Sequence, residues 1–257
     1  MDWAQTYQTL SQALKNGDVL DFGQKSFISF YKAFVEGDRW KLYLKGIGVT
    51  LELTVTALII GVVLGVLVAV VRTAHDQQRP GRRNPFLGVV NALCQVYTTV
   101  IRGTPMMVQL LIWGFVVFKT SRNHTMVGII GLGINSGAYV SEIVRGGLMS
   151  VDLGQSEAGR SLGLGYLDTM RFIVIPQAFK NILPALGNEL ITLFKDTSLV
   201  SAIGGTELVY FAEAVGAKTY EYMFPYVGIA LMYLVIVMIL TALQGKLERR
   251  LRQSDRR

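Results

Sequence analysis

The sequence predicts an all-α transmembrane protein with five membrane-spanning helices. Its residues are 51% apolar and only 17% charged, with a mean hydropathy of +0.40, whereas soluble domains usually carry about 25% charged residues. Long stretches have almost no charge, and basic residues gather in short runs beside apolar segments. This distribution is typical of a multi-pass membrane protein.

The five spans are predicted from apolar segments that can cross a hydrocarbon layer of roughly 30 Å at about 1.5 Å per residue. In chain order they are Gly46–Val71, Thr104–Phe118, Met126–Leu148, Leu183–Gly204 and Met223–Leu243. The second span is preceded by Pro85–Val100, which we expect to be an interfacial or partly inserted helix. Pro105 suits the first turn of the helix that follows. After this span, Lys119–Thr125 is expected to form a short loop.

Glycines inside two of the spans predict close helix packing. Gly61 and Gly65 form a small-xxx-small pair in the first span, and Gly133 and Gly137 form another in the third. Such pairs let helix backbones approach closely in a membrane.

The charge pattern predicts the orientation in the membrane. The run Lys246 to Arg257 holds six basic and two acidic residues, and Arg72 to Arg83 holds four basic and one acidic. Under the positive-inside rule both runs face the cytoplasm. Five spans then place the C-terminus in the cytoplasm and the N-terminus outside, and the acidic loop 205–224 fits the outer side.

Three regions are expected along the chain. Residues 1–40 form an extracytoplasmic or interfacial arm, residues 41–250 the transmembrane domain, and residues 251–257 a basic cytoplasmic tail. The arm carries aromatic residues at helical spacing, which suits a helix lying against the bilayer or the protein: Phe27, Phe30, Tyr31 and Phe34.

Several classes of function are excluded by what the sequence lacks. The single cysteine, Cys94, forms no intrachain disulfide, and the two histidines lie in different loops, so no metal site is expected. There is no phosphate-binding loop, nucleophile elbow or zinc-protease motif. The net charge of +7 is explained by membrane-flanking runs, so no nucleic-acid partner is expected.

Polar residues inside the third and fourth spans are candidates for a solute pathway. A charge at mid-bilayer costs about 2.5–3.5 kcal/mol on insertion scales, so these residues should face a partner helix or water. Asn135, Tyr139 and Glu142 share one helix face in the third span, and three fourth-span residues share another. The candidates in the third span are Asn135, Ser136, Tyr139 and Glu142. Those in the fourth span are Glu189, Thr192 and Asp196, which share one face, and Ser198. The alternative is that Lys195 and Glu189 sit near helix ends or pair with other buried charges.

A polar insert, residues 149–182, separates the third and fourth spans on the predicted cytoplasmic side. Two short helices are expected in it, Gln155–Leu162 and Leu167–Ile175. Gly163 and Gly165 supply the turn between them.

The insert resembles the EAA loop of the membrane subunits of ABC importers. The family pattern is Glu-Ala-Ala, three residues, Gly, nine residues, then Ile-x-Leu-Pro. The matching residues are Glu157-Ala158-Gly159, Gly163 and Ile173-x-Ile175-Pro176. Gly159 stands in place of Ala and Ile175 in place of Leu, and both changes keep the position small or apolar.

Other stretches are similar to the polar amino acid branch of that family, over roughly residues 30–250. They are Gly46-Ile47-Gly48-Val49-Thr50-Leu51, Arg102-Gly103-Thr104-Pro105, Ser136-Gly137-Ala138-Tyr139, and Lys195-Asp196-Thr197-Ser198-Leu199.

The resemblance implies a permease subunit of an ATP-driven importer for polar amino acids, with the type I fold, in a bacterial plasma membrane. Its partners would be a second permease subunit, identical or related, a cytoplasmic ATPase and an extracytoplasmic amino-acid-binding protein. ATP-Mg would bind to the ATPase, and this chain would hold no cofactor and be no enzyme. The residues implied in ATPase contact are Glu157, Ala158, Gly159, Arg160, Gly163, Ile173 and Pro176.

An ion-coupled secondary amino acid carrier is the alternative hypothesis. Such carriers often contain inverted repeats and broken helices, and no convincing repeat is visible in this sequence.

Overall fold

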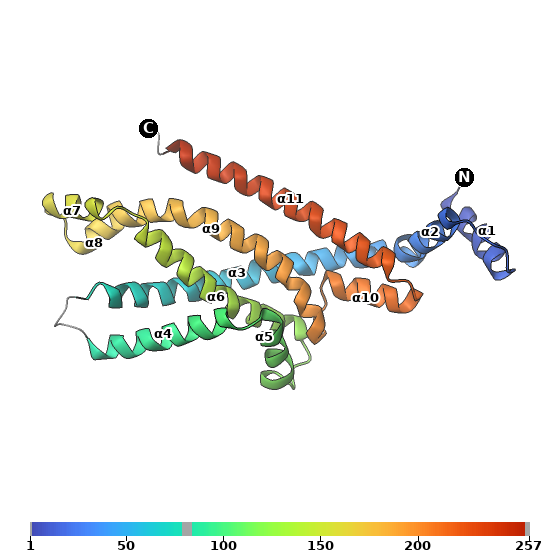
Figure 1. The fold of residues 1–257 in the computed structure, drawn as a ribbon, viewed down its shortest axis with the longest axis horizontal. Helices are drawn as coiled ribbons and strands as arrows, with labels where there is room; N and C mark the ends of the chain where they lie inside the picture. Colours follow the sequence, from blue (N-terminus) through green and yellow to red (C-terminus); the bar gives the residue numbers. More distant parts are fainter. Residues whose placement is uncertain (1, 79–83, 255–257) are drawn as a thin grey trace. The chain divides into compact units, whose positions relative to one another are not determined.

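A computed structural model describes residues 2–78 and 84–254, and these residues are almost entirely helical, with no strand among them. Part of the basic run Arg72 to Arg83 and the end of the predicted tail therefore lie outside the described residues. The α-helices, labelled in Figure 1, are α1 (Trp3–Lys15), α2 (Phe22–Phe30), α3 (Trp40–Asp76), α4 (Pro85–Gly103), α5 (Met106–Ile112), α6 (His124–Met149), α7 (Leu153–Ser161), α8 (Tyr166–Thr169), α9 (Ile175–Asp196), α10 (Leu208–Thr219) and α11 (Met223–Ser254). Short π- or 3₁₀-helical segments extend them at Tyr31–Val35, Glu36–Asp38, Trp113–Val117, Met170–Val174 and Thr197–Ile203.

Three helices, α3, α6 and α11, are each long and apolar enough to cross a membrane. Two bent pairs also qualify, Pro85–Gly103 with Met106–Val117 and Tyr166–Ile203 with Leu208–Thr219. The all-α membrane fold is thus confirmed, and five spans result when each bent pair counts as one.

The break predicted before the second span is confirmed, but its bounds differ from the predicted Val100 and Thr104 by a few residues. α4 ends at Gly103, and the axis turns by 108° before the next helix begins at Met106. Pro105 causes the break because it has no N–H to donate, and it disfavours helical geometry at the residue before it. Thr104 accordingly has an extended backbone, at φ −118° and ψ 145°.

The predicted division after the insert is wrong. We expected a short helix Leu167–Ile175 separate from a span at Leu183–Gly204, but the chain is helical from Tyr166 to Ile203 without a break. Pro176 directly follows the π-helical segment Met170–Val174, and Pro184 lies inside α9. The helix therefore continues through both prolines.

Two other boundaries differ from the prediction. The segment 205–224, expected as an outer loop, contains the helix α10. The first and last spans extend beyond their apolar stretches, because polar residues at both ends of α3 and at the C-terminal end of α11 continue the helix.

The predicted glycine pairs do bring helices together. A methyl group added to Gly65 would stand 2.7 Å from the Val140 side chain, and one added to Gly133 would stand 2.7 Å from Ile60. The two helices α3 and α6 therefore interlock through glycine on both sides, as small-residue packing in membranes requires. α6 also makes its most extensive contact with α9, which crosses it in Figure 1.

The chain divides into two compact units, to both of which α3 and α11 contribute. One unit comprises residues 1–50 and 206–236, and the other comprises residues 51–205 and 237–257. The larger unit has two apolar cores. One is Ala57, Leu110, Val127, Leu132, Leu193, Val200 and Ile203, and the other is Ala69, Val140, Val144, Val151, Val174, Ala178 and Ile182.

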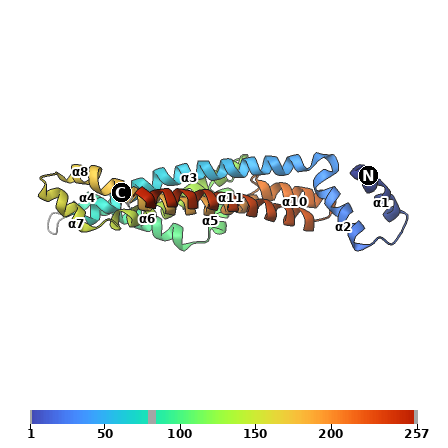
Figure 2. The same cartoon turned by 90° about the horizontal axis from the view of Figure 1, so that it is seen from above.

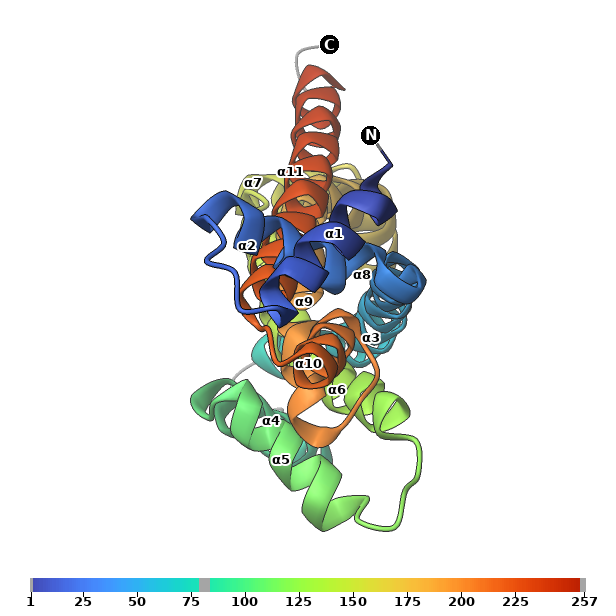
Figure 3. The ribbon, with the colours of Figure 1, turned by 90° about the vertical axis from the view of Figure 1, so that its right-hand side faces the viewer.

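The smaller unit contains the N-terminal arm, whose α1 and α2 are drawn as two separate short helices in Figures 2 and 3. Aromatic contacts hold them together: Tyr7 stacks on Tyr31 at 4.3 Å between ring centroids. The Tyr7 hydroxyl donates to Glu36 at 3.1 Å. Burial, and then the neighbouring Glu36 carboxylate, raise the pKa of Tyr7, so the phenol stays a hydrogen-bond donor at neutral pH.

Candidate coupling hairpin and solute pathway

The polar insert between the third and fourth predicted spans, residues 149–182, forms a helical hairpin. Its first helix, α7, begins after Asp152, whose side chain accepts a hydrogen bond from the Gly154 N–H at 2.6 Å. It ends with paired backbone bonds, from Gly163 N–H to Arg160 C=O at 2.9 Å and from Leu164 N–H to Gly159 C=O at 3.0 Å. This is the Schellman termination, in which the residue after the cap adopts a left-handed backbone, and Gly163 does so at φ +80°.

Gly159 faces inward, toward the second arm of the hairpin. It is buried, and a methyl group in its place would stand 3.0 Å from the side chains of both Thr169 and Ile173. Its small size is thus needed for packing within the hairpin itself. Ile173, another residue predicted to touch an ATPase, is part-buried in the same seam.

The other predicted contact residues point outward. Glu157, Ala158, Arg160, Gly163 and Pro176 are all exposed. Large apolar side chains stand out beside them: Leu162 is 80% exposed and Leu167 is 78% exposed. The hairpin therefore presents an apolar tip with a carboxylate and a guanidinium at its rim, which is the composition of a protein-docking surface.

One hydrogen bond joins the hairpin to the end of α3, and an ion pair joins the same end of α3 to α6. Tyr166 of α8 donates a hydrogen bond to Gln77, just beyond the end of α3. Arg145 of α6 pairs with Asp76 at 2.6 Å between nitrogen and oxygen. A displacement of the hairpin would thus be transmitted to the end of α3.

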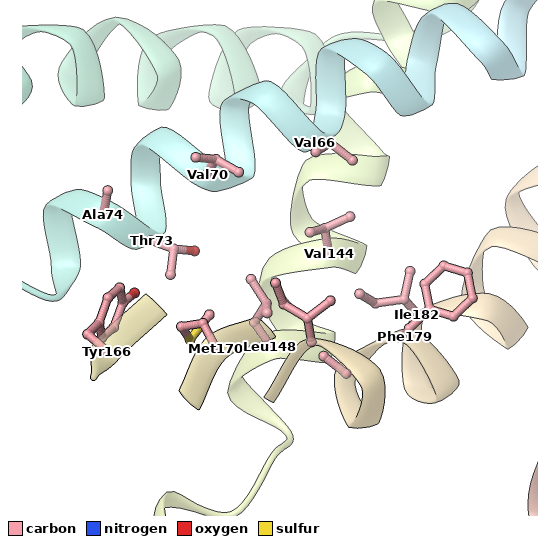
Figure 4. A pocket seen from close by; sticks show the side chains of 12 residues that line it. Val66, Val70, Thr73, Ala74, Val144, Leu148, Tyr166, Met170, Phe179 and Ile182 are labelled. Atoms are coloured by element: carbon pink, nitrogen blue, oxygen red, sulfur yellow. The ribbon is translucent and has the colours of Figure 1, made fainter. Parts of the chain in front are cut away.

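An apolar cavity of about 390 Å³ lies between the hairpin's second arm and helices α3, α6 and α9. In Figure 4 the side chains of Val66, Val144, Met170 and Ile182 lie around it. Its walls carry only two hydroxyl groups, those of Thr73 and Tyr166. Such an apolar lining does not suit a charged or zwitterionic solute.

The predicted pathway residues separate into three groups. The first joins α6 to α9, because the Ser136 hydroxyl donates to the Glu189 carboxylate at 2.7 Å. Ser136 is fully buried and Glu189 is part-buried. This pair is consistent with the expectation that polar residues in the two spans face one another.

The second group fixes the bend between α4 and α5. Asn135 donates to the Gln109 side-chain oxygen at 3.1 Å. The Gln109 amide nitrogen in turn donates to Ile101 C=O at 2.7 Å and to Thr104 C=O at 3.1 Å. Gln109, which sequence reasoning missed, thus satisfies the backbone carbonyls that the break leaves free.

The third group is a charge cluster on the opposite part of α6. Glu142 contacts Arg72 of α3 directly and lies 3.9 Å from Arg102 of α4. The Arg102 guanidinium lies 5.5 Å from the ring centroid of Tyr139. Asn135, Tyr139 and Glu142, which were predicted to share one face, therefore have different surroundings: Asn135 is buried at the bend, whereas the other two are partly open.

The remaining fourth-span candidates are not gathered into a site. Thr192 is exposed, Asp196 is part-buried, and the Ser198 hydroxyl donates to the Lys195 C=O of its own helix at 2.7 Å. Among the described residues no three His, Cys, Asp or Glu side chains gather as metal ligands would.

Comparison with known proteins gives one consistent result. The model of the family described as the inner membrane component of binding-protein-dependent transport systems matches residues 61–253. The arginine transport system permease protein ArtQ of Bacillus subtilis is 37% identical over 215 residues, covering 82% of this chain and 93% of that protein. The putative glutamine transport system permease protein GlnP of Rickettsia typhi is 33% identical over 230 residues, covering 88% and 98%.

Solved structures give the same result. A chain from an amino acid ABC transporter crystallised with histidines is 40% identical, with a TM-score of 0.73 over 82% of this chain and 94% of that one. A chain of the inward-facing methionine ABC transporter MetNI shares the fold at 20% identity, with a TM-score of 0.68.

Proposed function

Since this chain belongs to the family of inner membrane components of binding-protein-dependent transport systems, we propose that its exposed hairpin receives the ATP-driven motion that moves a polar amino acid through it. The chain is a multi-pass protein of the bacterial inner membrane and a permease subunit of an amino acid ABC importer. It is not an enzyme, because ATP hydrolysis belongs to a separate ATPase subunit. The relatives favour this function over an ion-coupled carrier.

The hairpin is the proposed docking site for the ATPase. Its outward residues Glu157, Ala158 and Arg160 supply small and charged contacts, and Leu162 and Leu167 supply apolar ones. ATP-Mg would bind to the ATPase, and this chain would hold no cofactor. The mechanism is a population shift. Closure of the ATPase subunits favours one orientation of the hairpins, and this orientation favours opening of the pathway to one side of the membrane.

The proposed orientation places this hairpin and the C-terminus in the cytoplasm and the N-terminal arm outside. Support comes from the basic charge of residues 72–83 and 246–257. The proposed assembly contains a second permease subunit, the ATPase and an extracytoplasmic amino-acid-binding protein.

The proposed solute is a polar amino acid. Relatives of this chain are described as transporting arginine, glutamine and L-cystine, which share the α-amino and α-carboxylate groups and differ in the side chain. The proposed pathway includes the α6 residues Asn135, Ser136, Tyr139 and Glu142 and the α9-side residues Glu189, Thr192, Asp196 and Ser198. The partly open polar surface around Tyr139 and Glu142 supports it.

Uptake by the complete complex in proteoliposomes tests the proposal. ATP supplied on the hairpin side, with the binding protein on the other side, should drive accumulation of a labelled amino acid. Accumulation by this chain alone, driven by an ion gradient without ATP, would contradict it.

A further inference from the structure

Arg102 occupies an unusual position for a charged side chain. It is the last residue but one of α4, directly before the 108° bend. Its side chain is 45% exposed, although it belongs to a segment that counts as part of a membrane span. A guanidinium at such a place faces a partner or a water-filled path, since exposure to lipid is costly.

The protein itself gives Arg102 only a weak partner. Its one ion pair among the described residues is the 3.9 Å approach to Glu142, and that carboxylate is already in direct contact with Arg72. Two guanidinium groups therefore share one carboxylate, and the cluster keeps a positive charge. Arg72 is the better buried of the two, at 13% exposure, so the unsatisfied charge is that of Arg102.

The neighbouring groups hold Arg102 ready for an anion. The ring of Tyr139 supports the guanidinium at 5.5 Å, and this leaves the N–H groups at the edge of the guanidinium plane free to donate. The backbone beside it is fixed, because Gln109 holds the carbonyls of Ile101 and Thr104. A planar guanidinium fixed in this way matches a carboxylate with two parallel hydrogen bonds, which a lysine ammonium cannot do.

We propose that Arg102 binds the α-carboxylate of the transported amino acid. The inference rests on the proposed function and adds the group that recognises the solute. It places recognition on the part of the solute that all α-amino acids share, so Arg102 sets the substrate class and leaves the choice of side chain to other residues.

The test compares amino acids with their α-amides, which lack the carboxylate charge. The purified permease–ATPase complex, without binding protein, is titrated with arginine and argininamide and with glutamine and glutaminamide. The wild-type complex should bind each acid at least about tenfold more tightly than its amide, because a charge-assisted pair is lost with the amide. Arg102→Gln should reduce this ratio to within about twofold. Arg102→Lys should keep part of it, because a point charge remains.

Controls separate this inference from the function on which it rests. Arg249→Gln removes an exposed arginine at the far end of α11 and should leave the acid-to-amide ratio unchanged. Basal ATP hydrolysis shows that each variant complex is assembled, and if Arg102→Gln does not assemble, the Arg102→Lys ratio decides. If the variant that assembles has the same acid-to-amide affinity ratio as the wild type, Arg102 does not bind the carboxylate. ATP-driven uptake by the wild-type complex is a separate measurement, and it tests the proposed function without regard to Arg102.

Discussion

At the scale of single residues, Gly159 and Gln109 each solve a local packing problem. Gly159 lets the two arms of the hairpin pack closely, because even a methyl group there would stand 3.0 Å from Thr169 and Ile173. Gln109 donates hydrogen bonds to two backbone carbonyls at the bend. An apolar side chain could fill the same space but would leave these carbonyls without a donor. One position favours a very small residue, and the other relies on a side-chain amide.

Gly159→Asp should abolish amino acid uptake while leaving the protein in the membrane. The carboxylate would be forced into the seam against Thr169 and Ile173, so the hairpin arms would separate and the docking surface would lose its shape. Uptake by proteoliposomes and membrane-fraction immunoblots measure the two effects. Gln155→Asp, an equal charge at an exposed position of the same helix, should transport normally. Normal uptake by the Gly159 variant would refute this role.

Gln109→Leu should lower the melting temperature of the complex. The carbonyls of Ile101 and Thr104 and the amide of Asn135 would lose their partner, at about 1–3 kcal/mol for each buried group left unsatisfied. Gln95→Leu, on the exposed side of α4, should melt as the wild type does. Equal melting temperatures for both variants would show that the bend does not depend on Gln109.

At the scale of elements, the hairpin depends on how α7 ends. The chain can turn back toward α8 only if the residue after the cap adopts a left-handed backbone, and Gly163 does this without steric cost. Both terminating hydrogen bonds then close on the last turn of α7.

Gly163→Val should therefore destabilise the hairpin. A β-branched residue at φ +80° costs at least the roughly 1–2 kcal/mol that an ordinary residue loses in the left-handed region. Gly163→Asn should be milder because asparagine tolerates this region. Nothing lies within 4 Å of a methyl group added at this position, so the backbone conformation and not crowding decides the effect. Hydrogen–deuterium exchange at the amides of residues 163 and 164 should be faster in the Val variant than in the Asn variant. The opposite order would show that the left-handed backbone is not the cause.

Elements were predictable from sequence where a local signal marks them. Pro105 marked the bend, Gly163 the turn, and the paired glycines of α3 and α6 their close contact. The merger of α8 with α9 was missed because the polar insert and the apolar span were treated as separate segments, whereas one helix runs through both. The roles of Arg72, Arg102 and Gln109 were also missed, because each depends on residues far away in the sequence that only the tertiary packing brings near.

At the scale of the whole molecule, an ATPase that acts on the hairpin from the cytoplasm requires one fixed orientation of the chain in the membrane. Chemical labelling of single cysteines checks it, in a Cys94→Ala background. Leu162→Cys, at the exposed tip of the hairpin, should react with a membrane-impermeant maleimide only in inside-out vesicles. Gln8→Cys, on the exposed face of α1, should react only in intact spheroplasts. Reaction of Leu162→Cys from outside would reverse the proposed orientation.

If the hairpin is the surface on which the ATPase acts, photo-crosslinking from its tip should capture that subunit. A benzophenone amino acid at Leu162, in the complete complex in membranes, should join this chain to the ATPase subunit, whereas the same group at Tyr220, exposed after α10, should not. The complex used must still hydrolyse ATP and take up amino acid. If position 162 then crosslinks to another protein and not to the ATPase, the ATPase does not dock on the hairpin.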